Sequence, residues 1–518
     1  MSVRILKYSI YITAFVVTVS CYKELEIQVQ PGFKFSAETG NFIRINDASC
    51  FLDTASKTFL FPIKKDSVAE YAPVISFQLD YPDLFINDVH IKNQQVNNLG
   101  NIKINTPYAV DFYSGNEIKD KFQLVFTPLP VIQVMIDEDI VDEPKKACKL
   151  LVNDPFSGTN PAYTQQYSTY AGIEIRGGIS QNYPKKSYNI ELWDDIQGSY
   201  TNKISLLGLR SDDDWIIDAM YIDQARMRNR ASWEIWKSFD SPQKYNSFQN
   251  PHLSIDGKFI EVFLNNNYLG LYCLNERVDP KLCVEYGMNF YDKEAAIYRA
   301  KNWSEAVWFT ACPDTNNTMG WNDGWLQEFP DDFTRWEPLY KFVDFVVNSP
   351  DTTFADHIDT FINLDNTIDY YIFLNLMQGF DNQAKNTLLV KANNRVPFII
   401  VPWDMDGTFG RNWDASHLGY DYILTNNFYE RLIGLNAQNY KERLAARWDE
   451  LRSDRLISSA VISKFNSYHS LFSHCGVINR ENNRWKESQL ELDKEIGYIT
   501  GWVQKRLNFL DEYFHELN

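Results

Sequence analysis

The sequence FDNQAKNTLLVKANNRVPFIIVPWDMDG occupies residues 380–407, and its pattern of polar and apolar residues decides how the second half of the chain folds. Two short apolar runs, 388–391 and 398–401, flank a turn at Asn393 and Asn394. Runs of this kind on either side of an Asn-rich turn predict a β-hairpin. Because a hairpin folds back on itself, the polar loops before and after it should emerge at the same end.

The two loops carry four side chains with oxygen ligands: Asp381, Asn386, Asp404 and Asp406. The predicted hairpin would bring them together, and hard oxygen donors of this kind suit Mg²⁺ or Mn²⁺. Protein kinases require the same order along the chain: a catalytic Asp, an Asn five positions later that holds metal, a hairpin, and a metal-binding Asp in a loop that ends in Gly. The interval from Asp381 to Asn386 is five positions, although the strings HRD and DFG are absent.

These loops have two other interpretations. The string DxDG also begins an EF-hand, but Gly407 falls at position four rather than six, and Ala415 stands at position twelve, where a Glu is required. The EF-hand is therefore weakly supported. The loops could also be ordinary Asn and Asp turns of a hairpin that binds nothing.

A second segment, residues 174–192, reads EIRGGISQNYPKKSYNIEL. It predicts two strands joined by a Gly-containing loop, with Arg176 and Lys186 placed to lie over a polyphosphate. Lys186 shares the parity of the apolar residues in the second strand, so it, rather than Lys185, should point inward. The alternative is a plain hairpin with solvated lysines. No Walker A, GxGxxG or GxSxG string occurs, so a P-loop, Rossmann or α/β-hydrolase site is not supported.

The N-terminal residues have the pattern of an export signal. Two basic residues precede an apolar run from Tyr8 to Val19, which is too short to cross a bilayer as a helix. Cys21 follows a small residue at the end of this run, as in a bacterial lipobox, which predicts a lipoprotein signal peptide at residues 1–20 and lipidation of Cys21. We therefore expect an exported lipoprotein of the outer membrane or cell surface that touches the membrane only through its lipid. Ordinary signal cleavage with an incidental cysteine is the alternative.

After a linker at residues 21–32, residues 33–128 alternate short apolar runs with Asn, Asp, Gly and Pro. This spacing predicts a small antiparallel β-sandwich of immunoglobulin-like type. The expected strands include residues 58–61, 74–77, 89–91, 108–112 and 122–126. No catalytic constellation occurs in this region, so we expect an accessory domain.

Residues 129–518 begin with strands and end with helices. Strands are expected at residues 131–136, 172–176, 188–192, 260–264 and 269–274. Helical stripes are expected at residues 223–239, 368–377, 440–451 and 499–514. A strand-rich first half followed by a helical second half predicts an α+β domain of two lobes, with two unrelated domains as the alternative.

The charge of the chain bears on its partners. Fifty basic and 68 acidic side chains give a formal net charge of −18. A protein this acidic should repel phosphate backbones, so nucleic acid is not expected as a partner.

Five segments resemble the spore-coat protein H (CotH) kinase family and keep the family's order. They are RGGISQNYPKKSYNIEL (176–192), LLGLRSDDDWIIDAMYIDQARMRNRASWEIW (206–236), IEVFLNNNYLGLYCLNERVD (260–279), DNQAKN (381–386) and PWDMDGTFG (402–410). The resemblance covers residues from about 130 to 518 and leaves the predicted β domain outside.

The resemblance implies an atypical protein-kinase-like fold of two lobes that binds ATP with Mg²⁺ or Mn²⁺ and phosphorylates Ser or Thr of exported or coat proteins. Carried over by motif, it implies these roles: Asp381 as catalytic base; Asn386, Asp404 and Asp406 as metal ligands; Arg176, Lys186 and Arg228 as phosphate contacts; and Glu276 in the nucleotide cleft.

This sequence departs from the family in the Gly-rich turn, which reads RGGIS where RGNSS is common. The strings DNxxKN and WDxD are intact. A second function stays open: a non-catalytic surface lipoprotein that keeps a kinase-like scaffold and binds glycans or surface proteins.

Overall fold

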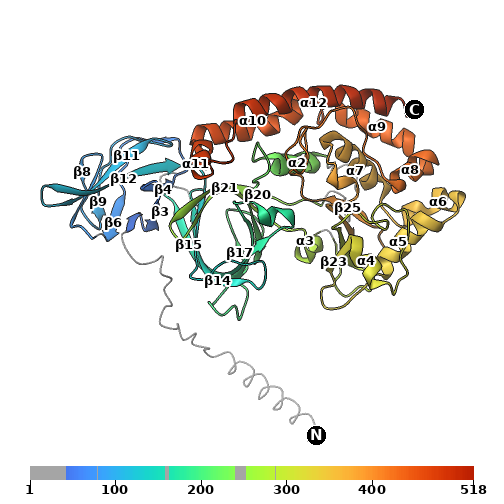
Figure 1. Cartoon of the computed structure of the whole chain (residues 1–518), viewed down its shortest axis with the longest axis horizontal. Coiled ribbons are helices and arrows are strands. Elements are labelled where there is room, and N and C mark those ends of the chain that lie inside the picture. Colours follow the sequence, from blue (N-terminus) through green and yellow to red (C-terminus); the bar gives the residue numbers. More distant parts are fainter. Residues whose placement is uncertain (1–41, 79, 158–162, 240–252, 286, 518) are drawn as a thin grey trace, which may run out of the picture.

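The structure, a computed structural model, describes residues 42–78, 80–157, 163–239, 253–285 and 287–517. The predicted signal peptide, Cys21 and the linker lie outside these residues. An all-β N-terminal part precedes a mostly helical C-terminal part, which confirms the expected order of strands and helices. Figure 1 shows the N-terminal sheets at one end, a barrel in the middle and the helices at the other end. Among the residues that the structure describes, none of the helices combines the length and the hydrophobicity that a transmembrane span requires.

The N-terminal sheets pack around a small apolar core. Their strands are β1 (Phe42–Ile45), β2 (Ala48–Ser49), β3 (Phe51–Asp53), β4 (Thr58–Pro62), β5 (Ser67–Val68), β6 (Val74–Gln78), β7 (Asp83–Ile86), β8 (Val89–His90), β9 (Gln95–Val96), β10 (Ile102–Lys103), β11 (Pro107–Ser114) and β12 (Glu117–Thr127). The sheets have the orders β2-β1-β6-β9 and β3-β4-β12-β11-β7-β8, with β10 and β5 as a separate pair. Alternation on β11 buries Tyr108, Val110 and Phe112. The immunoglobulin-like type of this region stays a prediction.

A closed barrel follows, in the order β13-β14-β15-β16-β19-β21-β20. Its strands are β13 (Val131–Met135), β14 (Lys146–Asp154), β15 (Gln165–Arg176), β16 (Ser187–Trp193), β19 (Asp214–Asp218), β20 (Gly257–Leu264) and β21 (Asn267–Asn275), and a short pair, β17 (Ile204–Ser205) and β18 (Ser211–Asp212), lies beside it. Parallel pairing of β13 with β20 closes the ring. The turn between β20 and β21 has positive φ at Asn265 and Asn266, as that hairpin requires.

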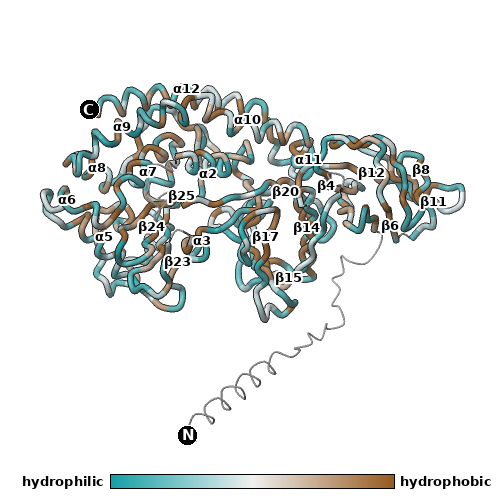
Figure 2. The backbone as a smooth tube through the Cα atoms, turned by 180° about the vertical axis from the view of Figure 1, so that it is seen from behind, coloured by the Kyte–Doolittle hydropathy of each residue, from teal (hydrophilic) through white to brown (hydrophobic). Residues whose placement is uncertain are grey.

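The C-terminal part combines a four-stranded sheet with helices. The sheet has the order β23-β22-β24-β25, with β22 (Ala296–Ala300), β23 (Trp325–Phe329), β24 (Thr387–Lys391) and β25 (Ile399–Pro402). The helices are α2 (Arg228–Ser238), α3 (Pro280–Glu285), α4 (Thr318–Gly324), α5 (Glu337–Asn348), α6 (Asp351–His357), α7 (Leu364–Met377), α8 (Asn427–Gly434), α9 (Tyr440–Arg452), α10 (Ser458–Cys475), α11 (Val477–Arg484) and α12 (Leu492–His515). Figure 2 shows hydrophobic segments in the barrel strands and the interior helices.

Helix α7 lies at the centre of this part and is buried on all sides. Its polar residues are tied to neighbouring backbone: the Asn366 amide donates to the carbonyl of Ile400 on β25, and the Asn375 amide donates to that of Leu424. A buried amide needs such partners, so these contacts fix the position of α7. The chain leaves α7 directly into the loop that holds Asp381.

Helix α2 begins at Arg228 and not at Asp223, where the apolar stripe predicted its start. The carboxylate of Asp223 accepts hydrogen bonds from the backbone N–H groups of Met227 and Arg228, each at 2.7 Å. These bonds hold residues 223–227 in a turn ahead of the helix. A side chain that competes for backbone donors favours such a turn over helix.

The C-terminal helices α10, α11 and α12 run along one side of the molecule, from the N-terminal sheets past the barrel to the far end (Figure 1). Glu481 on α11 is fully buried and accepts hydrogen bonds from Lys185 at 2.7 Å and from Arg226 at 3.1 Å. Its second oxygen accepts from the backbone of Leu271 on β21 at 2.9 Å. A Cβ on Gly270, which has φ +108°, would lie 2.0 Å from that oxygen.

This arrangement keeps Glu481 ionised. Burial alone would raise the pKa of Glu481, but Lys185 and Arg226 hold it below its ordinary value. Burial lowers the pKa of Lys185 to about 8, an effect that Glu481 opposes. Glu481 and Lys185 therefore each favour the charged form of the other.

We expect Glu481→Gln to lower the free energy of unfolding by about 3–5 kcal/mol, because it leaves Lys185 and Arg226 buried without a counter-charge. Urea denaturation of both proteins measures the difference. Glu487→Gln removes the same charge from an exposed position shortly after α11 and should change the value by less than about 0.5 kcal/mol. Equal effects of the two substitutions would contradict the role of Glu481 as the counter-charge of Lys185 and Arg226.

Candidate active site

The hairpin of β24 and β25 brings the two polar loops together, as its sequence predicts. Thr387 pairs with Pro402, so the residues just outside the hairpin, Asn386 and Trp403, are neighbours. The Asn386 amide donates to a carboxylate oxygen of Asp404 at 3.4 Å. Asn386 and Asp404 have φ values of +52° and +54°, which Asn and Asp tolerate better than most residues. The loops therefore emerge at one end of the hairpin.

Asn382 holds these loops in register, and the sequence pattern did not single it out. Its buried amide donates to the carbonyl of Asn386 at 2.9 Å and to that of Trp403 at 2.7 Å. Its own carbonyl accepts from the Tyr370 hydroxyl on α7 at 2.9 Å. Nothing in the sequence separates this Asn from the other polar residues of the loop, because its partners are set by the fold of both loops.

Asp381 begins a short 3-10 turn, Asp381–Gln383, shortly after α7 ends at Met377. Its carboxylate lies 3.7 Å from the ammonium group of Lys385. Partial burial raises the pKa of Asp381, and Lys385 opposes the shift. A half-buried carboxylate with a raised pKa is suited to accept a proton from a hydroxyl placed beside it.

Asp404 and Asp406 carry negative charge that the protein only partly compensates. Burial raises the pKa of both carboxyl groups, and the nearby charge of Asp218 raises both further. Asp404 is open to water from a cavity although protein surrounds it, and Arg176 is the main attraction that opposes its shift. Crowded carboxylates of this kind can hold a divalent cation, which would relieve their repulsion.

Asp218, at the end of β19, is a second residue that the sequence pattern did not single out. The Asn229 amide donates to its carboxylate at 3.3 Å, and the Asn229 oxygen accepts from the Met405 N–H at 3.4 Å. The barrel is thereby connected to the loop between Asp404 and Asp406 through one side chain of α2. Asp218 lies four residues beyond the last Asp of the run SDDDW, and no motif in the sequence marks it.

These residues line a cavity of 820 Å³ between the barrel and the C-terminal part. Five of the residues with predicted roles contribute to its wall: Arg176, Asp381, Asn386, Asp404 and Asp406. Further wall residues with charged or polar side chains include Asp142, Glu143, Glu174, Ser180, Lys185, Ser187, Asn189, Asp218, Asn229, Asn275, Arg277, Arg299, Lys301, Glu328, Asn382 and Lys385. Burial lowers the pKa of Arg176, whereas Asp218 and Asp404 oppose that shift.

The predicted inward orientation of Lys186 is wrong. Lys185 is the buried lysine and lines the cavity, whereas Lys186 donates to the backbone carbonyl of Gln181 at 2.6 Å and closes the loop before β16. The parity argument fails because β16 begins only at Ser187, so alternation does not extend back to the lysines. The same loop places Gly177 at φ +109°.

Arg228 and Glu276 belong to the framework, which corrects their expected place beside a nucleotide. The Arg228 guanidinium has no exposed surface and is paired with Asp223 at 2.7 Å and Glu495 at 2.5 Å. The Glu276 carboxylate accepts from the backbone N–H groups of Arg210 and Asp256. Neither residue lines the cavity. Because both side chains already have partners within the protein, they are not available to bind a ligand.

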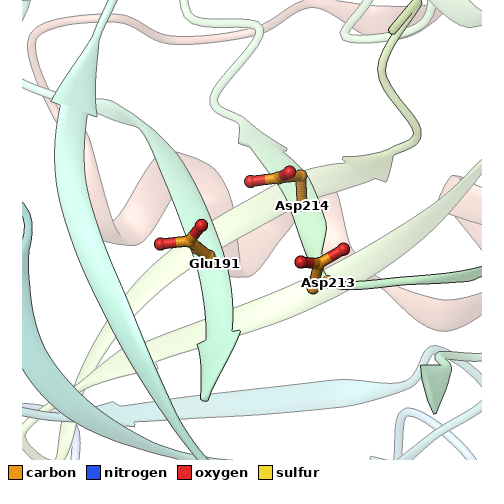
Figure 3. Close-up of side chains that lie close together, drawn as sticks. All are labelled: Glu191, Asp213 and Asp214. Carbon is orange, nitrogen blue, oxygen red and sulfur yellow. The ribbon is translucent and has the colours of Figure 1, made fainter. Parts of the chain in front are cut away.

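Carboxylates also gather outside the cavity, at Glu191, Asp213 and Asp214 (Figure 3). The ammonium group of Lys281 occupies this cluster, 2.6 Å from Asp213 and 2.7 Å from Asp214. Burial would raise the pKa of Asp213, but Lys281 holds it at about 2. The cluster is therefore an internal ion-pair network with its own cation.

We expect Asp404→Asn to stabilise the metal-free protein at neutral pH. A carboxyl group whose pKa is raised by folding contributes stability below its unfolded pKa, near 4, and that contribution is lost as pH rises through the folded pKa. Asn cannot ionise, so the variant does not lose this stability as the pH rises. Asn also tolerates the positive φ of this position. Melting temperatures are measured in EDTA from pH 4 to 8. The melting temperature of the variant should exceed that of the wild type, and the difference should grow as the pH rises.

The exposed Asp331→Asn is the control and should follow the wild type at every pH. A lower melting temperature of Asp404→Asn throughout the range would mean that attraction to Arg176 outweighs the repulsion.

The sequence of the chain also matches known proteins. The profile of the CotH kinase protein family matches residues 173–510, a span that contains Arg176 and both loops of the hairpin. Inner spore coat protein H of Bacillus subtilis (strain 168) is 22% identical to this chain over 306 residues, which is 58% of this chain and 74% of that protein. The N-terminal sheets lie outside the family match. Because the family profile covers more than half of the chain, the chain belongs to the CotH kinase family.

Proposed function

We propose that this chain is a metal-dependent, ATP-binding protein kinase that phosphorylates Ser or Thr of exported or surface proteins. The observation that carries the proposal is the convergence of Asp381, Asn386 and Asp404 at one end of a hairpin, in the wall of a large cavity. Membership of the CotH kinase family supports a kinase-like role. In this proposal the barrel and the C-terminal part are the two lobes that enclose ATP.

The metal ligands in this proposal are Asn386, Asp404 and Asp406. They can offer oxygen donors, which suits Mg²⁺ or Mn²⁺. Burial, and then repulsion from neighbouring carboxylates, raises the pKa of both Asp residues, and a dication would favour their ionised form. When bound, the metal would supply positive charge to the polyphosphate. Arg176 lies close enough to Asp404 and Asp218 to share their field, so it is the cation of the barrel that would contact phosphate oxygens.

The remaining chemistry is positioning and proton transfer. Asp381 would orient the acceptor hydroxyl and accept its proton. Lys385, 3.7 Å from Asp381, favours the ionised form of that carboxylate against the effect of burial and would leave a positive charge beside the transferred group. Asn382 would act as a positioning residue, because it holds the Asp381 and Asp404 loops in one geometry.

Two substitutions separate the predicted roles. Asp404→Ala should abolish nucleotide binding that depends on Mg²⁺ or Mn²⁺, because it removes a ligand of the metal. Asp381→Asn should leave the Kd for ATP within about twofold and lower phosphate transfer by roughly 10²- to 10⁴-fold, the usual loss for a missing general base. Calorimetry and autophosphorylation with each metal measure the two quantities.

Each outcome points to a definite function. Transfer that persists in Asp381→Asn would remove Asp381 from the role of base. Wild-type protein that binds no nucleotide with either metal would favour the non-catalytic surface lipoprotein, with ligands to be sought at the N-terminal sheets.

We further propose that the protein is exported and held at a membrane through lipid on Cys21, which the N-terminal pattern of the sequence supports. Metabolic labelling with a radioactive fatty acid should mark the wild type, and Cys21→Ala should lose the label and leave the membrane fraction. Labelling that survives in Cys21→Ala would exclude this anchor.

A further inference from the structure

Part of the cavity wall is apolar, in contrast to the charged residues around Asp404. We call this part the apolar recess, and its residues are Ile216, Ala219, Met220, Trp233, Ile255 and Asn275. Each of them is at most 6% exposed, so bulk water scarcely reaches this part of the wall. A concave apolar wall with a single amide among its side chains is typical of a site for a small molecule.

The register of the barrel strands places the residues of the recess side by side. Ile216 on β19 is directly opposite Asn275 on β21, and Asn275 is directly opposite Gly257 at the start of β20. Neighbouring strands lie about 4.8 Å apart. On the other side, Arg230 of α2 donates to the backbone carbonyl of Ile255 at 2.7 Å. The apolar recess therefore lies where the barrel meets α2.

The amide of Asn275 is held in place but not fully used. Its oxygen accepts from the Cys273 thiol at 3.1 Å, whereas its nitrogen has no hydrogen-bond partner among the residues that the structure describes. A Cβ on Gly257 would lie 2.2 Å from the amide oxygen, so the backbone of β20 packs closely behind it. A buried donor without a partner is costly. The free NH₂ group therefore marks the place where an acceptor atom of a ligand would bind.

The apolar recess adjoins the proposed metal and phosphate site. Ile216 stands two residues before Asp218 on the same face of β19, which separates the two side chains by about 6.6 Å. Trp233 stands four residues after Asn229 on α2, about 6 Å further along the helix axis. Because the Asn229 amide donates to Asp218 at 3.3 Å, both intervals lead from one contact to the recess. One sugar ring would span such an interval between a base and its phosphates.

We propose that the apolar recess binds the adenine base of the nucleotide and that the Asn275 amide donates a hydrogen bond to a nitrogen of its ring. The inference rests on the proposed function in taking ATP as the ligand. The faces of a flat base can be buried against apolar side chains such as Ile216 and Trp233. Every ring nitrogen of adenine except the one bonded to the sugar is an acceptor, so the free donor of Asn275 suits it.

Analogues of ATP test this contact without any change in the protein. The 1-deaza, 3-deaza and 7-deaza analogues each replace one ring nitrogen by C–H, which cannot accept the hydrogen bond. Isothermal titration calorimetry with Mn²⁺ should show one analogue that binds roughly 5- to 20-fold more weakly than ATP, because it leaves the Asn275 donor unpaired. The other two should bind within about twofold of ATP. Three analogues that all bind like ATP would overturn the proposal.

Variants of Asn275 connect the effect to its amide. Asn275→Leu removes the donor at similar volume, so it should weaken ATP by roughly 5- to 20-fold and should bind ATP and the sensitive analogue equally. Asn275→Asp offers only acceptors and should also weaken ATP, which provides a second test if the Leu variant does not fold. The exposed Asn316→Leu is the control and should leave the Kd for ATP unchanged. Melting temperatures show whether each variant is folded.

Tripolyphosphate with Mn²⁺, which has no base, separates this proposal from the proposed function. Its Kd should be the same for wild type and Asn275→Leu. Wild type that binds ATP no more tightly than tripolyphosphate, or a variant that weakens both ligands equally, would leave the phosphate site standing and overturn the recess.

If wild type binds neither ligand, the kinase proposal falls, and saturation-transfer NMR with adenosine then decides the recess. Transfer to the base that is lost in Asn275→Leu would support the recess. No transfer in wild type, or equal transfer in both proteins, would overturn it.

Discussion

The buried carboxylate of Glu481 is the interaction on which the arrangement of the two halves depends. It joins Lys185 and Arg226 at the barrel to helix α11, 296 residues after Lys185 in the chain. A buried ion pair contributes little net stability, but it allows only one placement of its members, because any other would leave a charge unpaired. The barrel wall, the residues before α2 and helix α11 are thus placed relative to one another. The barrel wall and α2 both contribute residues to the cavity.

In contrast to this buried ion pair, the acidic side chains at the cavity wall are only partly balanced by cations. Outside it, acidic clusters contain their own cation, as Lys281 does for Asp213 and Asp214. At Asp404 and Asp406 the protein supplies Arg176 but also adds Asp218, and both pKa values are raised. Crowding carboxylates that repel one another destabilises the fold, and in the proposed function a divalent cation would relieve that repulsion.

The amide of Asn382 and the side chain of Asn229 give this charged site its geometry. Asn382 bonds to the backbone of both loops, and Asn229 bonds to Asp218 and to the backbone of Met405. Neither side chain carries a net charge, so both can hold the acidic residues in place without adding charge to the site.

Local patterns in the sequence determined the order of strands and helices, the hairpin at residues 387–402 and the meeting of Asn386 with Asp404, because periodicity and turn residues act over a few positions. They also identified the family. Only the tertiary structure decided that Lys185 rather than Lys186 is buried, that Arg228 is occupied by Asp223 and Glu495, and that Asp218 and Asn382 belong to the site. Each of these depends on partners far away in the chain or on where a strand begins, and no local pattern records either.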